Sequence, residues 1–365
     1  MGSYLRIGII GAGPSGLALA RLLSDKGYDV HVYEAHKRFA TKPCGWGFPI
    51  LDGEETGYSV FSEAIKSSIW RYEGYNVYLD DEMLFHSRNR LLGYIIDKEE
   101  FLDRLAQGIS IYMDSPAKYN GRGVIRSRGG ERRYDAVIIA GGFSSQPKNL
   151  EKILAIQVIV RVPSIEEPEI PELRFYSDLV GYAWIFPEGE KSARIGVGGF
   201  ASRENLEKIL EHILKKRADI HGGEVVKKEG AQVTVSGIDW EAIKSRDPYY
   251  VGEAAGFILP ATGEGIRPSM WSSIALFKSI EKGTPYVDEL RELRITRVIR
   301  IQRRILDLML RMSPRDRSEF LREIPEELML KIALGRLQTR DLLSLAKVSR
   351  VINILARYSL TLSPL

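Results

Sequence analysis

The only cysteine of this 365-residue chain lies in a segment whose neighbouring residues mainly shape the backbone. Cys44 stands between Pro43 and Gly45 in the sequence PCGWG, residues 43–47. A thiol can relay a proton, and glycines let the backbone approach a neighbouring group closely. The alternative is that Cys44 is only a small buried hydrophobic residue. A single cysteine also excludes an internal disulfide, which favours a reducing, cytoplasmic location.

A second glycine-rich stretch, GAGPSG at residues 11–16, has the spacing of a dinucleotide-binding turn. The first glycine would make the tight turn, the second would admit a pyrophosphate, and the third would let helix and strand pack closely. Glu34 follows the next strand, where its carboxylate can accept hydrogen bonds from a ribose. The alternative is a glycine-rich turn that binds nothing. The predicted dinucleotide contacts are Gly11, Gly13, Pro14, Ser15, Gly16, Glu34 and Ala35.

The elements around these residues predict a parallel α/β domain, because buried strands and helices alternate at the start of the chain. From about residue 157 to 240, strands alternate with turns and are interrupted by one helix. From about residue 285 the chain reads as helical. We therefore predict a mixed α/β (α+β) fold with three parts: a Rossmann-like dinucleotide-binding domain (1–160 and 246–284), an antiparallel-sheet substrate domain (161–245) and a C-terminal helical domain (285–365).

An aromatic stripe lies in the middle of the predicted sheet domain. Tyr182, Trp184 and Phe186 alternate along the sequence, so they share one face of a strand, and Pro187 ends that strand. The returning strand carries glycines, among them Gly196 and Gly198, which would leave room against the sheet. The stripe is either an aromatic core face or the wall of a binding slot.

Three stretches are similar to motifs of the p-hydroxybenzoate-hydroxylase-like FAD flavoproteins: residues 94–101 (YIIDKEEF), 137–145 (VIIAGGFSS) and 252–266 (GEAAGFILPATGEGI). Lys98, Gly141 and Glu253 stand where Arg, Asp and Asp are usual. Within this group, Y-x-W-x-F-P followed by G-x-G, together with PCGWG, resembles the geranylgeranyl reductases. The chain is identified as a member of that family, in which the related archaeal enzymes are digeranylgeranylglycerophospholipid reductases.

The resemblance implies FAD as cofactor, with the segment holding Cys44 beneath the isoalloxazine and the thiol beside its reactive edge as a catalytic residue. It implies proton addition and hydride transfer to C=C bonds of geranylgeranyl chains, in archaeal-type membrane lipids or geranylgeranyl diphosphate. The electron donor stays open between NAD(P)H, ferredoxin and others. The further cofactor contacts implied are Cys44, Gly45, Gly47, Lys98, Ala117, Gly141, Glu253, Gly263, Gly265 and Ile266. The substrate contacts implied are Tyr182, Trp184, Phe186, Pro187, Gly196 and Gly198.

Two other functions stay open. One is a flavin-dependent monooxygenase of the same fold that acts on an aromatic compound or a prenylated quinone. The other is a catalytically silent, lipid-binding relative, which the departures at Lys98, Gly141 and Glu253 suggest. No metal site is expected.

The net charge of +4 comes from the end of the chain, where residues 281–365 carry 17 Lys and Arg against 11 Asp and Glu. Arg291, Arg294, Arg297, Arg300 and Arg304 follow one another at helical spacing, with apolar residues on another face. Such a helix can lie on an anionic membrane surface, and the alternative is an ordinary solvated helix face. Basic charge without interleaved aromatic residues argues against nucleic acid. No apolar run is long enough to span a membrane.

Overall fold

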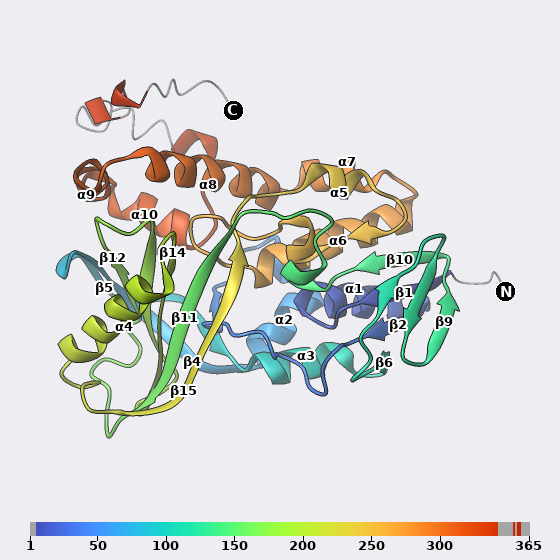
Figure 1. Ribbon diagram of the computed structural model, residues 1–365, viewed down its shortest axis with the longest axis horizontal. Coiled ribbons are helices and arrows are strands. Elements are labelled where there is room, and N and C mark those ends of the chain that lie inside the picture. Colours follow the sequence, from blue (N-terminus) through green and yellow to red (C-terminus); the bar gives the residue numbers. More distant parts are fainter. Residues whose placement is uncertain (1–4, 342–352, 355, 359–365) are drawn as a thin grey trace.

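The computed structural model describes residues 5–341, 353–354 and 356–358. Figure 1 shows a parallel sheet with its helices on one side of the molecule, a large second sheet on the other, and helices running across one edge of both. The mixed α/β class predicted from the sequence is confirmed.

The first sheet is parallel and has the strand order β16-β10-β1-β2-β6. Its strands form because they are short apolar runs with both faces covered. Helices α1 and α6 pack against each other beside this sheet. The strands are β1 (Arg6–Ile10), β2 (Asp29–Tyr33), β6 (Ser110–Tyr112), β10 (Ala136–Ile139) and β16 (Tyr249–Tyr250); the helices are α1 (Pro14–Ser24), α3 (Lys98–Ala106) and α6 (Ile266–Lys282).

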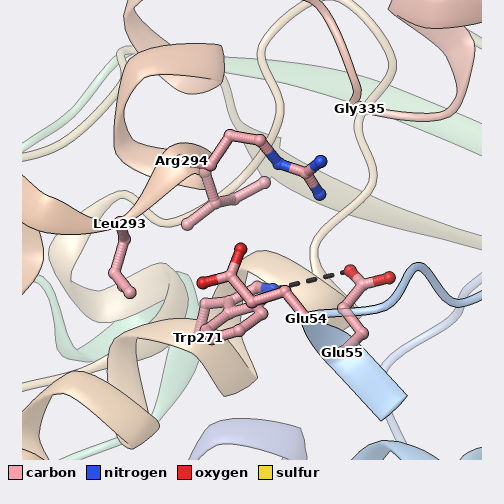
Figure 2. Close-up of a pocket in the computed structure, with 7 residues that line it drawn as sticks. Glu54, Glu55, Trp271, Leu293, Arg294 and Gly335 are labelled. Carbon is pink, nitrogen blue, oxygen red and sulfur yellow. Dashed lines mark hydrogen bonds between the residues drawn. The ribbon is translucent and has the colours of Figure 1, made fainter. Parts of the chain in front are cut away.

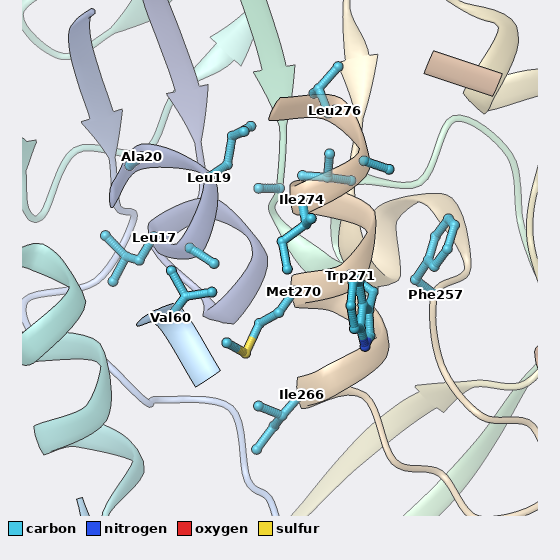
Figure 3. Close-up of a cluster of buried hydrophobic side chains, with 14 of the residues drawn as sticks. Leu17, Leu19, Ala20, Val60, Phe257, Ile266, Met270, Trp271, Ile274 and Leu276 are labelled. Atoms are coloured by element: carbon cyan, nitrogen blue, oxygen red, sulfur yellow. The ribbon is translucent and has the colours of Figure 1, made fainter. Parts of the chain in front are cut away.

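The largest hydrophobic cluster lies between these helices. Leu17 and Leu19 of α1 are buried in one cluster with Met270 and Ile274 of α6, and Figure 3 shows Met270 and Ile274 on the side of α6 that faces α1. This packing fixes the start of α1 and the start of α6 relative to one another. Both predicted glycine turns immediately precede these helix starts.

The second sheet is mixed and has eight strands in the order β15-β11-β14-β13-β12-β4-β5-β3. Helix α4 (Arg203–Lys216) covers one face, where its apolar side chains pack on β11 and β14. The strands are β3 (Gly47–Pro49), β4 (Ser68–Leu79), β5 (Glu82–Ile96), β11 (Lys152–Arg161), β12 (Glu172–Phe175), β13 (Gly181–Pro187), β14 (Ser192–Gly199) and β15 (Glu224–Thr234).

The second sheet is larger than the range 161–245 that we predicted for it. Strands β3, β4, β5 and β11 come from residues that we had assigned to the dinucleotide-binding part. We missed β5 because its centre, residues 86–90, is HSRNR, which lacks the apolar alternation of a half-buried strand. The pairing of β4 with β12 is parallel and joins segments far apart in sequence, which no local pattern reveals.

Smaller elements complete the described fold. They are η1 (Glu55–Gly57), α2 (Ser59–Lys66), a three-stranded sheet of β7 (Lys118–Tyr119), β8 (Val124–Ser127) and β9 (Gly130–Arg133), η2 (Gly142–Ser145), α5 (Trp240–Lys244) and η3 (Gly252–Ala255).

The C-terminal part is helical over the residues that the structure describes, as predicted. Helix α8 is the longest, and its apolar face is buried under the rest of the protein. In the described ranges, no helix has both the length and the apolar character needed to cross a membrane. The helices are α7 (Tyr286–Glu292), α8 (Arg294–Arg311), α9 (Pro314–Glu323) and α10 (Glu326–Ala333).

Candidate active site

The GAGPSG turn lies between β1 and α1 and has the backbone that the glycine spacing predicts. Gly11 has φ +109°, and a Cβ there would lie 2.5 Å from the Ala140 carbonyl oxygen. A Cβ at Gly16 would overlap the Gly11 carbonyl, so helix and strand approach too closely for a side chain. At Gly13 a Cβ would meet no atom within 4 Å. The turn therefore leaves open space at the N-terminus of α1, where the helix dipole favours a phosphate.

Glu34 directly follows β2 and faces the same turn. Its Oε2 accepts a hydrogen bond from the Ala12 amide at 3.0 Å, and its Oε1 accepts one from the His36 amide at 3.0 Å. Oε1 also contacts the His36 Nδ1 at 2.7 Å, so Oε2 is the oxygen that keeps capacity for a ribose hydroxyl. Neighbouring Ala35 is exposed. The turn and the carboxylate fit the adenosine half of a dinucleotide.

On the other side of the turn, Glu253 in η3 is 8% exposed. Its Oε2 forms an ion pair with the Lys42 Nζ at 2.5 Å, and its Oε1 accepts from the Thr234 amide at 3.2 Å. The nearby Gly141 explains one departure from the family pattern: a Cβ there would lie 3.0 Å from the Ser145 Cβ. The position where an Asp side chain would begin is thus occupied by Ser145.

Lys98 begins α3 and is 6% exposed. Its Nζ donates to the Lys42 carbonyl at 3.3 Å, and it takes part in no ion pair within the described ranges. Burial lowers the pKa of Lys98, while the nearby Cys44 thiol and the Glu253 carboxylate act in the opposite direction. The structure therefore places a buried amine against the backbone two residues before the only cysteine.

The PCGWG segment is fixed to the centre of the second sheet. The Gln157 side-chain amide donates to the Cys44 carbonyl at 3.1 Å, and the Trp46 amide donates to the Cys44 sulfur at 3.5 Å. A Cβ at Gly45 would lie 3.3 Å from the Phe186 ring and 3.6 Å from the Trp184 Nε1. The glycines therefore let this segment lie directly against the aromatic stripe.

The stripe on β13 is a continuous aromatic surface. Ring centroids are 5.9 Å apart for Tyr182 and Trp184, and 6.3 Å apart for Trp184 and Phe186. A Cβ at Gly196 would lie 2.6 Å from the Trp184 Cε2, so the indole lies across this glycine. We expected Gly196 to leave room against the sheet, and the indole occupies that room. At Gly198 the nearest atom to a Cβ is the Ala155 Cβ at 3.1 Å.

Trp184 carries a polar atom that the protein does not satisfy. Its Nε1 is buried and has no hydrogen-bond partner, although Gly45 lies opposite. A buried, unpaired donor costs about 1–3 kcal/mol. An orphaned N–H between the aromatic stripe and the PCGWG segment is therefore consistent with a ligand-binding position.

The second glycine turn is tied to the same stripe. The Tyr182 hydroxyl donates to the Thr262 carbonyl at 2.5 Å, and burial raises the pKa of this hydroxyl. Gly263 then has φ +69°, and Gly265 and Ile266 begin α6. At the other end of β13, the Pro187 carbonyl accepts from the Tyr72 hydroxyl at 2.8 Å.

The structure thus brings three predicted groups together: the PCGWG segment, the Tyr182–Phe186 stripe and the turn before α6. Ala117 packs in a cluster with Ile10 and Tyr33, the residues that directly precede Gly11 and Glu34. Sequence reasoning missed Gln157 and Lys42. Gln157 did carry a signal, because it is a polar residue in the middle of the apolar run ILAIQVIV.

The chain is similar to known proteins over much of its length. The family model of an NAD(P)-binding Rossmann-like domain matches residues 9–44. The chain is 25% identical over 297 residues to the geranylgeranyl diphosphate reductase of Synechocystis sp., covering 72% of each chain. It is 26% identical over 314 residues to the digeranylgeranylglycerophospholipid reductase of Thermoplasma acidophilum, covering 73% of this chain and 75% of the relative.

A solved structure of a geranylgeranyl bacteriochlorophyll reductase-like protein from Thermoplasma acidophilum has the same fold. The TM-score is 0.77 at 20% sequence identity, covering 97% of this chain and 99% of the other. The resemblance that the motifs carried is thereby shown along most of the chain. The chain is therefore similar to named geranylgeranyl reductases over 72–73% of its length, and it has the fold of the reductase-like structure.

Proposed function

We propose that the protein is an FAD-dependent reductase that saturates C=C bonds of geranylgeranyl chains. The observation that carries this proposal is the direct contact between the glycines of PCGWG and the aromatic stripe on β13. It places the lone thiol, a buried amine and an apolar aromatic surface in one small region. Reduction of an isolated alkene needs a proton donor and a dry apolar wall together.

FAD fits the residues around this region. The open position at Gly13, the helix start behind it and the Glu34 carboxylate suit the adenosine and pyrophosphate. The Glu253 carboxylate and the turn before α6 suit the other half of the cofactor. When bound and reduced, the flavin supplies the hydride.

The chain's own residues would supply the proton and hold the alkene. Cys44 donates a proton from its sulfur to one alkene carbon, which leaves tertiary cation character on the other. The neighbouring Lys98, whose pKa is lowered by burial, can return a proton to the sulfur. The alternative role of Cys44 is packing alone, and the variant Cys44→Ala separates proton donation from packing.

The aromatic stripe would stabilise the cation and exclude water. Tyr182 and Trp184 present ring faces, and cation–π attraction is worth about 2 kcal/mol at a desolvated site. Water would trap the cation, so a closed apolar wall is a requirement of the reaction. A monooxygenase of the same fold would use the same reduced flavin with oxygen, and the mass of the product distinguishes the two reactions.

The proposal is tested by the mass of the product. Dithionite-reduced enzyme is incubated without oxygen with geranylgeranyl diphosphate or with an archaeal-type geranylgeranyl phospholipid. We expect the substrate mass to rise in steps of two hydrogen atoms. A substrate that gains oxygen mass in air, or does not change at all, would contradict the proposal.

We further propose that α8 contacts the anionic membrane that holds a lipid substrate. Arg297, Arg300 and Arg304 are exposed on one face of this helix and form no ion pair with described residues. The predicted set is smaller in the structure, because Arg291 pairs with Asp288 and Arg294 turns inward to Asp52. The apolar face of α8 is buried against the protein, so the contact would be electrostatic and not an insertion.

A further inference from the structure

A cavity of about 240 Å³ lies between β5, the start of α8, and the segment formed by α10 and the residues after it. Five basic side chains line it: Arg90, Arg294, Lys331, Arg336 and Arg340. They come from three segments that are distant in sequence. The cavity is therefore a basic site that only the fold assembles, and the mechanism above makes no use of it.

The acidic residues of this cavity do not neutralise it. Lys331 pairs with Asp341 at 2.9 Å, and Arg294 pairs with Asp52. Arg90 approaches Glu327 only to 3.7 Å, and both side chains are about half exposed, so water screens this pair strongly.

Arg336 and Arg340 form no ion pair with any residue in the described ranges. Neither guanidinium therefore has an ion-pair partner among the described residues, and both line the cavity where an anion could contact them.

Arg336 has the environment of a cation that lacks a partner. Its Nη2 donates to the Ile50 carbonyl at 2.6 Å, whereas its Nε is buried without any hydrogen-bond partner. Burial lowers the pKa of Arg336, the nearby positive charges of Arg267 and Arg294 lower it further, and the Asp52 and Glu55 carboxylates act in the opposite direction. The side chain is half-buried and its Nε is unpaired, so an anion in the cavity would complete its environment.

Arg267, close by, shows the contrast. It is 1% exposed, and its guanidinium pairs with Glu55 at 3.1 Å and with Glu264 at 2.6 Å. Glu55 also accepts from the Trp271 indole in the narrow neighbouring pocket of Figure 2, into which Arg294 also projects. Arg267 is therefore a satisfied structural cation that links the turn before α6 to η1. Arg336 is not satisfied in this way.

An apolar path joins the basic cavity to the candidate active site. Leu330 and Leu334, which line the cavity, pack in one cluster with Phe175, and the Phe175 ring lies 6.0 Å from that of Tyr182. Ile50, which Arg336 contacts, follows Cys44 by six residues, so the two lie at most about 20 Å apart. That distance is within the length of an extended geranylgeranyl chain.

We propose that this basic cavity binds the phosphate-bearing head group of the prenyl substrate. The inference rests on the proposed function and adds the head-group site to it. The paired Arg294 and Lys331 would shape the cavity, while Arg336 and Arg340 contact phosphate oxygens. Guanidinium groups suit this role because their planar fork matches two phosphate oxygens at once.

The variants Arg336→Gln and Arg340→Gln test the proposal, with Arg203→Gln on α4 as the charge-matched control. Arg340 is exposed and forms no hydrogen bond or ion pair with another described residue, so its variant separates binding from folding. The substrates are geranylgeranyl diphosphate, a geranylgeranyl phospholipid and geranylgeraniol, which has no phosphate. We expect KM for the phosphorylated substrates to rise about 10- to 100-fold, as loss of one charge-assisted hydrogen bond gives. KM for geranylgeraniol and every kcat should stay unchanged.

Calorimetric titration with inorganic diphosphate gives a readout independent of activity. We expect wild type and the Arg203→Gln control to bind it, and the two cavity variants to bind it at least 10-fold more weakly. If the variants raise KM for the geranylgeranyl phospholipid but not for geranylgeranyl diphosphate, the phospholipid is the natural source of the phosphate. Equal KM values and equal diphosphate binding in all four proteins would overturn the head-group site. Absence of any reduction by wild type, with diphosphate binding still lost in the variants, would instead overturn the proposed function alone.

Discussion

The Gln157 side-chain amide donates a hydrogen bond of 3.1 Å to the Cys44 carbonyl, and it also donates to the Glu229 carboxylate at 2.6 Å. Strand β11 thereby fixes the position of the only cysteine relative to the aromatic stripe on β13. Gln157 is a polar residue in an otherwise apolar strand because its side chain donates to the Cys44 carbonyl, which the neighbouring glycines leave accessible. The geometry around Cys44 is set by the sheet and not by its own loop.

Replacement of Cys44 by Ala should slow reduction of the alkene while FAD remains bound. General acid catalysis typically raises a rate about 10²–10⁴-fold, and alanine has no proton to donate. Reoxidation of the reduced flavin by substrate in a single turnover measures the step. Cys44→Ser serves as the control for packing. Equal rates in wild type and Cys44→Ala would leave the thiol as a packing residue.

The buried Lys98 gives the stability of the protein a distinctive pH dependence. Its pKa is lowered in the folded state, so between that value and the unfolded value of about 10.4 the unfolded chain binds more protons. The free energy of unfolding should therefore rise with pH across this window. In Lys98→Met this rise should be absent, and in the exposed Lys208→Met it should persist. Chemical denaturation at a series of pH values measures it, and parallel curves for wild type and Lys98→Met would refute the prediction.

Trp184 separates a core role from a substrate role. It is 9% exposed and lies across Gly196, so Trp184→Ala should destabilise the protein by about 3–5 kcal/mol. Trp184→Phe keeps most of the packing and removes the unpaired N–H, so its stability should be equal to or higher than that of wild type. We expect this second variant to bind the prenyl substrate more weakly. Unchanged KM and kcat in Trp184→Phe would assign the indole to the core.

The exposed arginines of α8 should make membrane binding dependent on charge. We expect the triple variant of Arg297, Arg300 and Arg304 to Gln to sediment less with vesicles that contain anionic lipid, since each cation near such a surface is worth about 1 kcal/mol. Wild-type binding should weaken as salt rises. The matched control replaces Arg203, Lys208 and Lys215 on α4. Equal loss in both triple variants would leave α8 as a solvated helix face.

The sequence predicted the local features well because each depends on neighbouring residues. The glycine spacing of residues 11–16 imposes one turn geometry, and the alternation from Tyr182 to Phe186 defines one face of a strand. The packing of Trp184 into the space above Gly196 was not predicted, because it depends on the register between β13 and β14. A pair across two strands is fixed only when the strands meet.

Other features lie beyond any local pattern. The long strand β5 contains charged residues at positions that a half-buried strand would fill with apolar ones, because its edge near Arg88 is exposed. The basic cavity combines Arg90, Arg294 and Arg336, and Arg90 and Arg336 are 246 positions apart in the sequence. Only the docking of the C-terminal helices on the second sheet brings their charges together.

One measurement tests the central claim most directly. The flavin of the purified protein is reduced with dithionite and mixed, without oxygen, with a geranylgeranyl phospholipid or with geranylgeranyl diphosphate. The reductase account predicts that the oxidised flavin spectrum returns and that the lipid gains two hydrogen atoms for each flavin reoxidised. Flavin that stays reduced with both substrates and is reoxidised only when oxygen is admitted would contradict it.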